Sequence, residues 1–263
     1  MAATNKTTLI TGASSGIGYE LAKLFAHDHY NLVLVARSGA KLAQLSDEMQ
    51  RQFGITARAV TADLAAPSAP EQLFAQLGKD GIAIDVLVNN AAYGKFGPFS
   101  EMSLEEVTGQ IELNIVGLTT LTRLFLPGMI ARKSGRILNV ASTAGFQPGP
   151  LMAVYYASKA YVVSFSEAIA NELKGSGVTV TCLCPGPTDT GFQGRAGVEN
   201  SRLFQQFGAM DAKTVARDGY RALMKGKTLT ISGFKNLLLA ESVRIAPRKL
   251  ATAISRWVAE EKR

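Results

Sequence analysis

Short apolar runs alternate with longer amphipathic stretches along almost the whole chain. Several short runs are apolar at consecutive positions, which is typical of parallel strands covered by helices on both faces. The alternation predicts a single doubly wound α/β domain with a parallel sheet of about seven strands and helices on both faces. The predicted strands are 7–11, 31–36, 56–62, 84–89, 135–141, 178–184 and 227–231. The predicted helices are 16–28, 39–53, 70–78, 103–131, 155–174 and 211–225.

The pattern changes in the last third of the chain. Residues 188–210 have no regular period and contain four glycines. Long stretches without periodicity in a compact domain are often functional lids, so we expect a substrate lid here. The predicted main domain is 1–234, and residues 235–263 are predicted to form a C-terminal helical extension of the same domain. This extension is predicted to contain two helices, 235–245 and 248–260, which are separated at Pro247.

The second helix of the extension has an apolar stripe of Leu250, Ile254, Trp257 and Val258, with basic residues nearby. Three roles are open for this stripe: contact with a membrane surface, a dimer contact, or packing on its own domain. Membrane contact is the least favoured of the three.

The composition narrows the classes of partner. The chain has 263 residues, 47% of them hydrophobic and 19% charged, which is typical of a globular protein with a large core. Its formal net charge is +7. Nucleic-acid binding requires a basic stripe with stacking aromatics or a docking motif, and neither occurs, so we expect no nucleic-acid partner. The charge fits an anionic ligand or surface better.

Compartment and metal content are also constrained. The N-terminus does not resemble a signal peptide, and no apolar run approaches the roughly 20 residues of a membrane span, so we expect a cytoplasmic protein. Cys182 and Cys184 share one strand face, which disfavours a disulfide and predicts two buried thiols in a reducing compartment. His27 and His29 are predicted at a solvated helix end, and we expect no metal site.

A glycine-rich turn follows the first predicted strand. Gly12, Gly16 and Gly18 precede a helix that begins YELAKLFA. Such a turn lets the backbone approach a pyrophosphate, whose charge then faces the N-terminus of the helix. A tight turn alone also requires glycine, but this position after the first strand favours dinucleotide binding.

The end of the second strand indicates which dinucleotide. An acidic residue there would bind the ribose 2′-hydroxyl of NAD, but the strand ends with Ala36, Arg37 and Ser38. The Arg37 guanidinium can pair with a 2′-phosphate, and Ser38 can add a hydroxyl. A solvated arginine is the alternative. We therefore expect NADP, with NAD less favoured.

Two adjacent tyrosines precede a lysine in the helix after the fifth strand. Tyr155 is four residues and Tyr156 three residues before Lys159, and both spacings place the side chains on one helix face. Helix geometry alone does not choose between them. Ser142, just after the fifth strand, lies at the sheet edge where ligands bind in such folds.

This arrangement resembles the short-chain dehydrogenase/reductase family, whose Tyr-x-x-x-Lys motif matches Tyr155 and Lys159 and so selects Tyr155. Ala92 departs from the family, which usually has glycine at that position. Further motifs similar to the family's, in the same order, are TGASSGIG (11–18), ADL (62–64), NNAA (89–92), ELNIVG (112–117) and PGPTDT (185–190). The resemblance implies a Rossmann fold. It implies as catalytic residues Ser142, Tyr155, Lys159 and Asn114, and as cofactor-binding residues Gly12, Ser14, Ser15, Gly16, Ile17, Gly18, Arg37, Ser38, Asp63, Leu64, Asn90, Ala91, Tyr155, Lys159, Pro185, Gly186, Thr188 and Thr190.

The implied chemistry is hydride transfer between a nicotinamide cofactor and a carbonyl or alcohol. Negative charge that develops on the carbonyl oxygen must be protonated, and a lysine near the phenol is expected to lower the tyrosine pKa toward neutrality. The resemblance assigns the proton to Tyr155, the substrate oxygen to Ser142, the ribose to Lys159 and a water path to Asn114.

We therefore expect an NADP(H)-dependent oxidoreductase that reduces a small hydrophobic ketone or a 3-oxoacyl-type substrate. Isomerase or dehydratase chemistry with the same cofactor, or a non-catalytic dinucleotide sensor, are the alternatives. The family also implies a homo-oligomer, either a dimer or a tetramer. Tyr93, Phe96 and Phe99 either line the substrate pocket or fill a core. An apolar underside of the lid is predicted from Phe192, Leu203, Phe204 and Phe207.

Overall fold

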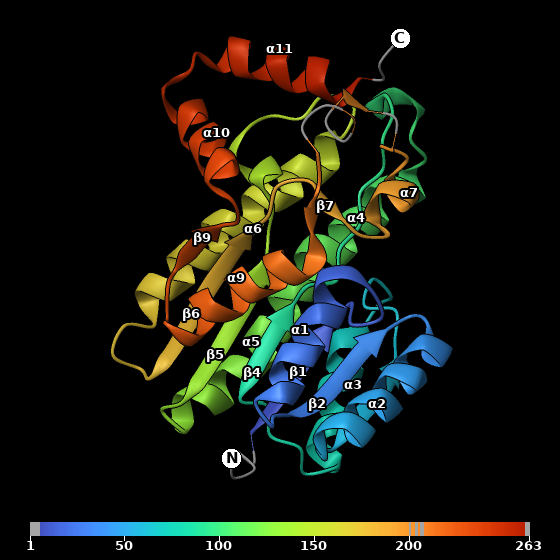
Figure 1. Ribbon diagram of the computed structural model, residues 1–263, viewed down its shortest axis with the longest axis vertical. Coiled ribbons are helices and arrows are strands. Elements are labelled where there is room, and N and C mark those ends of the chain that lie inside the picture. Colours follow the sequence, from blue (N-terminus) through green and yellow to red (C-terminus); the bar gives the residue numbers. More distant parts are fainter. Residues whose placement is uncertain (1–5, 200, 203–204, 206–207, 261–263) are drawn as a thin grey trace.

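The computed structural model describes residues 6–199, 201–202, 205 and 208–260, and in this part of the chain one sheet has seven parallel strands (Figure 1). The strands are β1 (Thr7–Thr11), β2 (Asn31–Ala36), β3 (Ala57–Thr61), β4 (Val86–Asn89), β5 (Gly135–Val140), β6 (Val178–Cys184) and β9 (Leu229–Ile231). The strand order is β3-β2-β1-β4-β5-β6-β9. This order confirms the predicted doubly wound sheet, although β4 and β9 are shorter than expected.

The chain leaves β1 in two directions across the sheet. Strands β2 and β3 follow on one side of β1, and β4 pairs with β1 on the other side, with Leu9 opposite Leu87. At such a switch point the loops after the two central strands diverge and leave a crevice at their carboxyl ends. The glycine loop and the NNAA loop therefore begin beside each other.

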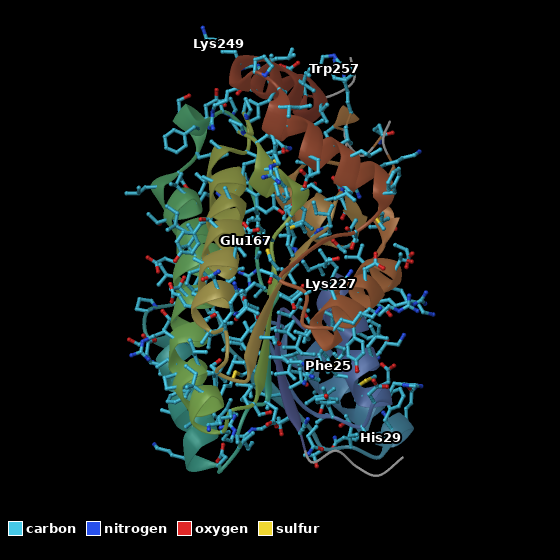
Figure 2. The ribbon with its side chains drawn as sticks, turned by 90° about the vertical axis from the view of Figure 1, so that its left-hand side faces the viewer. Phe25, His29, Glu167, Lys227, Lys249 and Trp257 are labelled. Carbon is cyan, nitrogen blue, oxygen red and sulfur yellow. The ribbon has the colours of Figure 1, made fainter. Side chains whose placement is uncertain are left out.

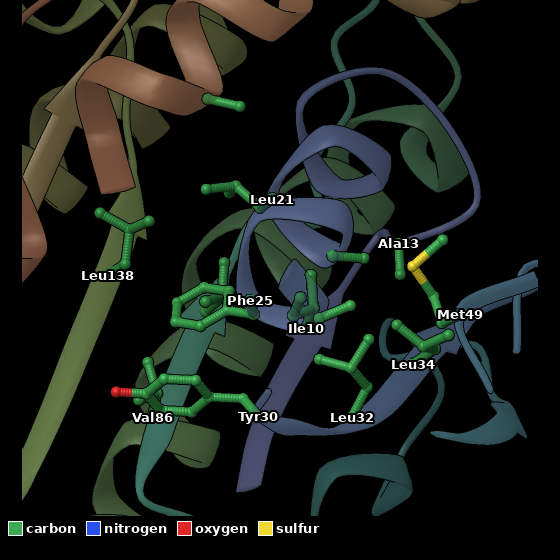
Figure 3. Packing of buried hydrophobic residues seen from close by; sticks show 14 of the residues in the cluster. Ile10, Ala13, Leu21, Phe25, Tyr30, Leu32, Leu34, Met49, Val86 and Leu138 are labelled. Carbon is green, nitrogen blue, oxygen red and sulfur yellow. The ribbon is translucent and has the colours of Figure 1, made fainter. Parts of the chain in front are cut away.

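One face of the sheet is covered by α1 (Gly16–His27), α2 (Gly39–Phe53) and α9 (Ala212–Met224). Figure 3 shows the side chains packed beneath α1, with Phe25 between the helix and the sheet. The Phe25 ring lies edge-on to Tyr30 and Tyr220, with ring centroids 5.3 and 4.9 Å apart. Tyr220 also donates a hydrogen bond to Asp28, so α9 is joined to the end of α1.

The opposite face is covered by α3 (Ala69–Lys79), α5 (Leu118–Ala131) and α6 (Ala153–Glu172). Their apolar side chains meet alternate residues of the same strands, as expected when consecutive strand residues point to opposite faces. Leu9 and Leu87 of the sheet contact this second core, together with Leu73 of α3 and Phe125 and Met129 of α5.

The predicted helix 103–131 is continuous but not uniform. It consists of α4 (Leu104–Ile111), a π-helical segment η2 (Glu112–Gly117) and α5. Within this 28-residue helix an 18-residue window has a mean hydropathy of 1.4, so by length and composition the helix could cross a membrane, which we did not expect from the sequence. Leu121, Phe125 and Met129 are buried against the sheet, which makes it a core helix of this domain.

The predicted lid has more regular structure than its sequence pattern indicates. It begins with β7 (Thr188–Asp189), which pairs in parallel with β8 (Met210–Asp211) at the other end of the segment. Between them lies the short helix α7 (Phe192–Ala196). The predicted apolar residues Leu203, Phe204 and Phe207 lie outside the described residues.

Two helices follow β9 and lie at one end of the molecule (Figure 1). They are α10 (Phe234–Ile245) and α11 (Arg248–Ala259), which match the predicted pair separated at Pro247. Two short 3-10 helices, η1 (Phe99–Glu101) and η3 (Thr143–Phe146), complete the described elements.

Candidate active site

One pocket of about 380 Å³ lies at the carboxyl edge of the sheet. It is lined by every residue predicted to bind the cofactor except Gly18, and by Ser142, Tyr155 and Lys159. The fourth predicted catalytic residue, Asn114, does not line it. Gly12 and Ser142, which are 130 positions apart in the chain (142 − 12), therefore meet in one cleft, because the parallel strands all end at the same edge.

The glycine loop has a backbone that only glycine adopts easily. Gly12 and Gly16 have φ angles of +65° and +57°. Gly18 lies behind the pocket wall, where an added Cβ atom would lie 2.4 Å from the carbonyl oxygen of Gly12. The side chain of Ser15, the N-cap of α1, makes no capping hydrogen bond to any described residue. The first amide groups of α1 are therefore available to a phosphate, and this cradle fits the pyrophosphate of a dinucleotide.

Thr11 and Asn90 hold the glycine loop against the loop after β4. The Asn90 side-chain amide donates to the carbonyl oxygens of Thr11 and Gly12, at 2.9 and 3.2 Å. The Thr11 hydroxyl accepts hydrogen bonds from the backbone amides of Asn90 and Ala91, at 2.9 and 3.0 Å. Ala92 does not have a positive φ angle, so the departure from the family's glycine leaves the turn unstrained.

Arg37 and Asp63 lie together at the exposed end of the pocket. The Arg37 side chain is 65% exposed, and its Nη1 atom lies 4.0 Å from Oδ2 of Asp63. A pair with this exposure and distance contributes little to stability, so Arg37 remains free to meet an incoming anion. Ser38 and Leu64 line the pocket beside this pair.

Ser142, Tyr155 and Lys159 meet at the other end of the pocket. Ser142 follows β5, and its hydroxyl donates a 3.3 Å hydrogen bond to the carbonyl oxygen of Pro185. Tyr155 lies in the first turn of α6 and lines the same pocket. Lys159 is one turn further along α6, and its Nζ atom lies 5.7 Å from the centre of the Tyr155 ring. The ammonium donates a 2.7 Å hydrogen bond to the carbonyl oxygen of Val140. Two hydroxyls and one ammonium therefore share one wall, a set that can bind and protonate a carbonyl oxygen.

The ionisation of this group differs from our expectation that Lys159 would lower the tyrosine pKa. Burial raises the pKa of Tyr155 above its ordinary value of 10.0, and the polar Ser142 hydroxyl nearby only partly opposes this rise. Burial also lowers the pKa of Lys159 to about 8. The ammonium donates to the Val140 carbonyl oxygen, and removal of the phenol from water is the largest influence on the pKa of Tyr155. Tyr155 consequently stays protonated at neutral pH.

The lowered pKa of Lys159 predicts a pH-dependent stability. The unfolded chain holds this proton up to the ordinary pKa of 10.5, whereas the folded chain releases it near pH 8. Between these values the unfolded state binds more protons, so folding becomes more favourable as the pH rises. We expect the cofactor-free protein to gain roughly 3 kcal/mol relative to a Lys159→Met variant across this window. Thermal unfolding of both proteins from pH 7 to 10 measures this, and a difference independent of pH would contradict it.

Asn114 lies outside the pocket, and its side chain hydrogen bonds to Tyr93 and Ser158. Its side chain is buried in the π-helical segment, accepts from the Tyr93 amide at 3.1 Å, and donates to the Tyr93 carbonyl at 2.8 Å and to Ser158 at 3.0 Å. The Ser158 hydroxyl donates in turn to the carbonyl oxygen of Tyr155 at 2.7 Å. Asn114 thus links η2 to the helix that presents Tyr155.

The apolar part of the pocket is built from the lid and from the segments on either side of the tyrosines. Phe192 of α7 lies 5.1 Å from the Tyr155 ring, and Phe96 packs in the same cluster. Tyr93 lines the pocket. Phe99 is 60% exposed and belongs to neither the pocket nor a buried core, so both expectations for it were wrong.

Several pocket residues were not predicted from the sequence. Tyr156, which the family motif did not select, also lines the pocket, and its hydroxyl is near Ser255 of α11. The other unpredicted lining residues include Met152, Arg195, Val198, Ser201 and Ala259. The sequence holds no indication of Arg195, Val198, Ser201 and Ala259, because their positions depend on how the lid and α11 fold around the pocket.

Comparison with known proteins agrees with this geometry. The family model for short chain dehydrogenases matches residues 6–200. The ketoacyl reductase HetN of Nostoc sp. is 39% identical over 183 residues, which is 70% of this chain and 63% of that protein. Across the first curated relatives, the aligned part of the chain spans 52% to 63% of their length.

Two solved structures cover almost all of this fold. A short-chain dehydrogenase from Sphingobium yanoikuyae in complex with NADPH is 30% identical, covers 93% of this chain and 94% of its own, and has a TM-score of 0.82. A short chain dehydrogenase/reductase from Burkholderia phymatum in complex with NAD is 26% identical, covers 100% of both chains, and has a TM-score of 0.81. With its glycine cradle and its Ser142, Tyr155 and Lys159 wall, this chain belongs to the short-chain dehydrogenase family.

Proposed function

We propose that this protein is an NADP(H)-dependent oxidoreductase that reduces the carbonyl group of an apolar ketone or a 3-oxoacyl-type substrate. The observation that carries the proposal is that Ser142, Tyr155 and Lys159 line the same pocket as the glycine cradle. A bound nicotinamide dinucleotide supplies the hydride. The ketoacyl reductase of Nostoc sp. supports the carbonyl class of substrate by its name.

The chain supplies orientation and a proton. The Ser142 hydroxyl donates a hydrogen bond to the substrate oxygen and fixes its position beside the Tyr155 phenol. Tyr155 then donates its proton to that oxygen as negative charge develops on it. Because burial raises the pKa of Tyr155, the phenol is in its donating form at neutral pH, which favours reduction over oxidation.

Lys159 stabilises the tyrosine after the proton has left. Its ammonium lies 5.7 Å from the centre of the Tyr155 ring, close enough to stabilise a phenolate in a site with little water. Its pKa of about 8 also lets it return a proton near neutral pH. Asn114 holds the first turns of α6 through Ser158.

The preference for NADP rests on Arg37. Its exposed guanidinium at the end of β2 can form a paired hydrogen bond with a 2′-phosphate, and Ser38 lies beside it. The two solved relatives were obtained with NADPH and with NAD, so the family alone does not decide.

We expect Arg37→Ala to weaken NADPH binding by about 10- to 100-fold and to leave NADH binding unchanged, because only NADPH loses a charge-assisted hydrogen bond. Nicotinamide fluorescence titrations measure both affinities. The matched control is Arg51→Ala, an exposed arginine at the far end of α2 that should change neither affinity. Equal losses for the two cofactors, or no loss for either, would contradict the role of Arg37.

The apolar substrate class rests on the lid side of the pocket. Phe192, Met152 and Val198 line it, and Tyr156 closes it on the side of α11. The strand pair β7–β8 joins the two ends of 188–210, so this segment can move as one lid over the site.

Compartment and assembly are also part of the proposal. Cys182 and Cys184 are buried free thiols, which favours a reducing compartment such as the cytoplasm. Ile111 and Val116 are 37% and 43% exposed along α4 and η2, which favours contact with a second copy in a dimer or tetramer.

A further inference from the structure

The C-terminal helices direct their larger apolar side chains outward. In α11 the buried positions are Ala251, Ser255 and Ala259, and in α10 the buried residue is Ala240. Amphipathic helices usually bury the large apolar residues and expose the small or polar ones. The large exposed apolar residues of these helices, which we together call the C-terminal face, include Phe234, Leu238, Leu239, Leu250, Ile254 and Trp257, with exposures of 49% to 73%.

Basic residues surround the same apolar face. Lys235 is the second residue of α10, Arg248 is the first residue of α11, and Lys249 follows it. Among the described residues these three cations form no ion pair, whereas Arg244 pairs with Glu241 of the same helix and Arg256 pairs with Glu260, just after α11. Figure 2 shows Lys249 and Trp257 on the outermost helix, at the opposite end of the molecule from His29.

We propose that the C-terminal face docks on the surface of a lipid bilayer that contains anionic lipids. An interfacial helix of this kind buries Leu, Ile and Trp side chains at the headgroup level, while flanking lysines and arginines meet the lipid phosphates. Trp257 suits this boundary because its ring is apolar and its N–H is polar. A second copy of the chain fits this face less well, since a symmetric contact would bring two sets of unpaired cations together.

The docking face is joined to the substrate pocket. The Arg202 guanidinium lies 5.2 Å from the Trp257 ring and donates a 2.8 Å hydrogen bond to the Trp257 carbonyl oxygen. Two residues further along α11, Ala259 lines the pocket, as does Ser201 of the lid segment. A protein docked through α11 therefore holds its pocket close to the bilayer surface, from which an apolar substrate can enter.

Vesicle sedimentation tests the docking with the full chain and without a substrate. We expect the protein to bind vesicles that contain phosphatidylcholine and phosphatidylglycerol in a ratio of about 7 to 3, to bind pure phosphatidylcholine vesicles far more weakly, and to dissociate as salt is raised. Replacing Leu250 and Ile254 with serine should lower the partition coefficient about tenfold or more, because both side chains leave the apolar layer.

Removing the three unpaired cations of the C-terminal face tests the electrostatic part of the proposal. The triple variant Lys235→Ala, Arg248→Ala and Lys249→Ala should lower binding about 100-fold, from about 1 kcal/mol for each cation near an anionic surface. The matched control removes three exposed cations elsewhere, Arg51, Lys79 and Lys174, and lowers the net charge by the same amount. It should retain most of the binding. For the apolar pair, the control is Leu104→Ser with Ile130→Ser, which are 78% and 40% exposed on α4 and α5.

Each outcome decides the proposal. Binding that depends on anionic lipid and on the C-terminal face, with turnover of a water-soluble ketone unchanged in all variants, supports it. Equal losses in both triple variants would assign binding to overall charge and overturn the proposal. Absence of binding to anionic vesicles would also overturn it. A dimer that is lost in the Leu250→Ser, Ile254→Ser variant would then assign the face to a second copy.

Discussion

Replacing Tyr155 with phenylalanine is expected to lower kcat for carbonyl reduction by about 10³-fold, with the affinity for NADPH within a few-fold of wild type. The change removes the phenolic proton while leaving the ring that packs against Phe192, 5.1 Å away. General acid catalysis of this kind contributes about 10² to 10⁴-fold. Steady-state kinetics with a soluble 3-oxoacyl thioester, together with a cofactor titration, measure both parts.

Tyr156→Phe provides the contrast for this result. Its hydroxyl interacts with Ser255 of α11, and no described part of the site places it on Ser142 or Lys159. We expect a loss of about 1 kcal/mol in stability and a change in kcat of less than tenfold. A Tyr155→Phe variant with wild-type turnover, or a larger loss in Tyr156→Phe, would show that the proton donor has been assigned to the wrong residue.

Gly18→Ala is expected to weaken binding of NADPH and NADH alike by at least 100-fold. The added methyl group would lie 2.4 Å from the Gly12 carbonyl oxygen and 2.6 Å from the Asn90 side-chain nitrogen. The Gly12 carbonyl and the Asn90 side chain cannot easily move away, because the Asn90 amide donates hydrogen bonds to the carbonyl oxygens of Thr11 and Gly12. The glycine loop must therefore move, and the helix amides lose their alignment with the phosphates.

The control for this variant is Gly78→Ala, which also introduces a methyl group into a helix. No described atom lies within 4 Å of a Cβ at Gly78, and alanine favours the helix more than glycine does. We expect unchanged cofactor affinity and a gain of about 0.5–1 kcal/mol in stability. Circular dichroism separates the two effects for Gly18→Ala: a folded variant that binds either cofactor with wild-type affinity would contradict the role of the cradle.

The strands and the cofactor loop were predictable because their signals are local. A strand covered on both faces is apolar at consecutive positions, as in β6, whose bounds Val178–Cys184 match the prediction. The glycine loop depends on φ angles and a close backbone approach, and both requirements select glycine in the sequence itself. Ser142, Tyr155 and Lys159 were also predictable, because the Tyr-x-x-x-Lys spacing and the resemblance to the family are both visible in the sequence.

The remaining parts of the site depend on contacts between distant segments. Ala259 and Ser201 join the pocket only because α11 and the lid fold over the sheet, and no period in the sequence indicates this. The lid contains the helix α7, which was not predicted because five residues are too few to show a helical period in the sequence. The pKa of Tyr155 was predicted in the wrong direction because burial raises it, and burial is a property of the packed site.

The measurement that tests the central claim most directly follows the hydride. The protein is incubated with NADPH deuterated at the transferable position and with a panel of apolar ketones and 3-oxoacyl thioesters, and the products are analysed by mass spectrometry. We predict an alcohol that carries one deuterium on the former carbonyl carbon, formed in proportion to the cofactor consumed and absent with Tyr155→Phe. Tight NADPH binding with no labelled alcohol from any compound, or a rearranged product formed without loss of deuterium from the cofactor, would contradict the proposed reduction.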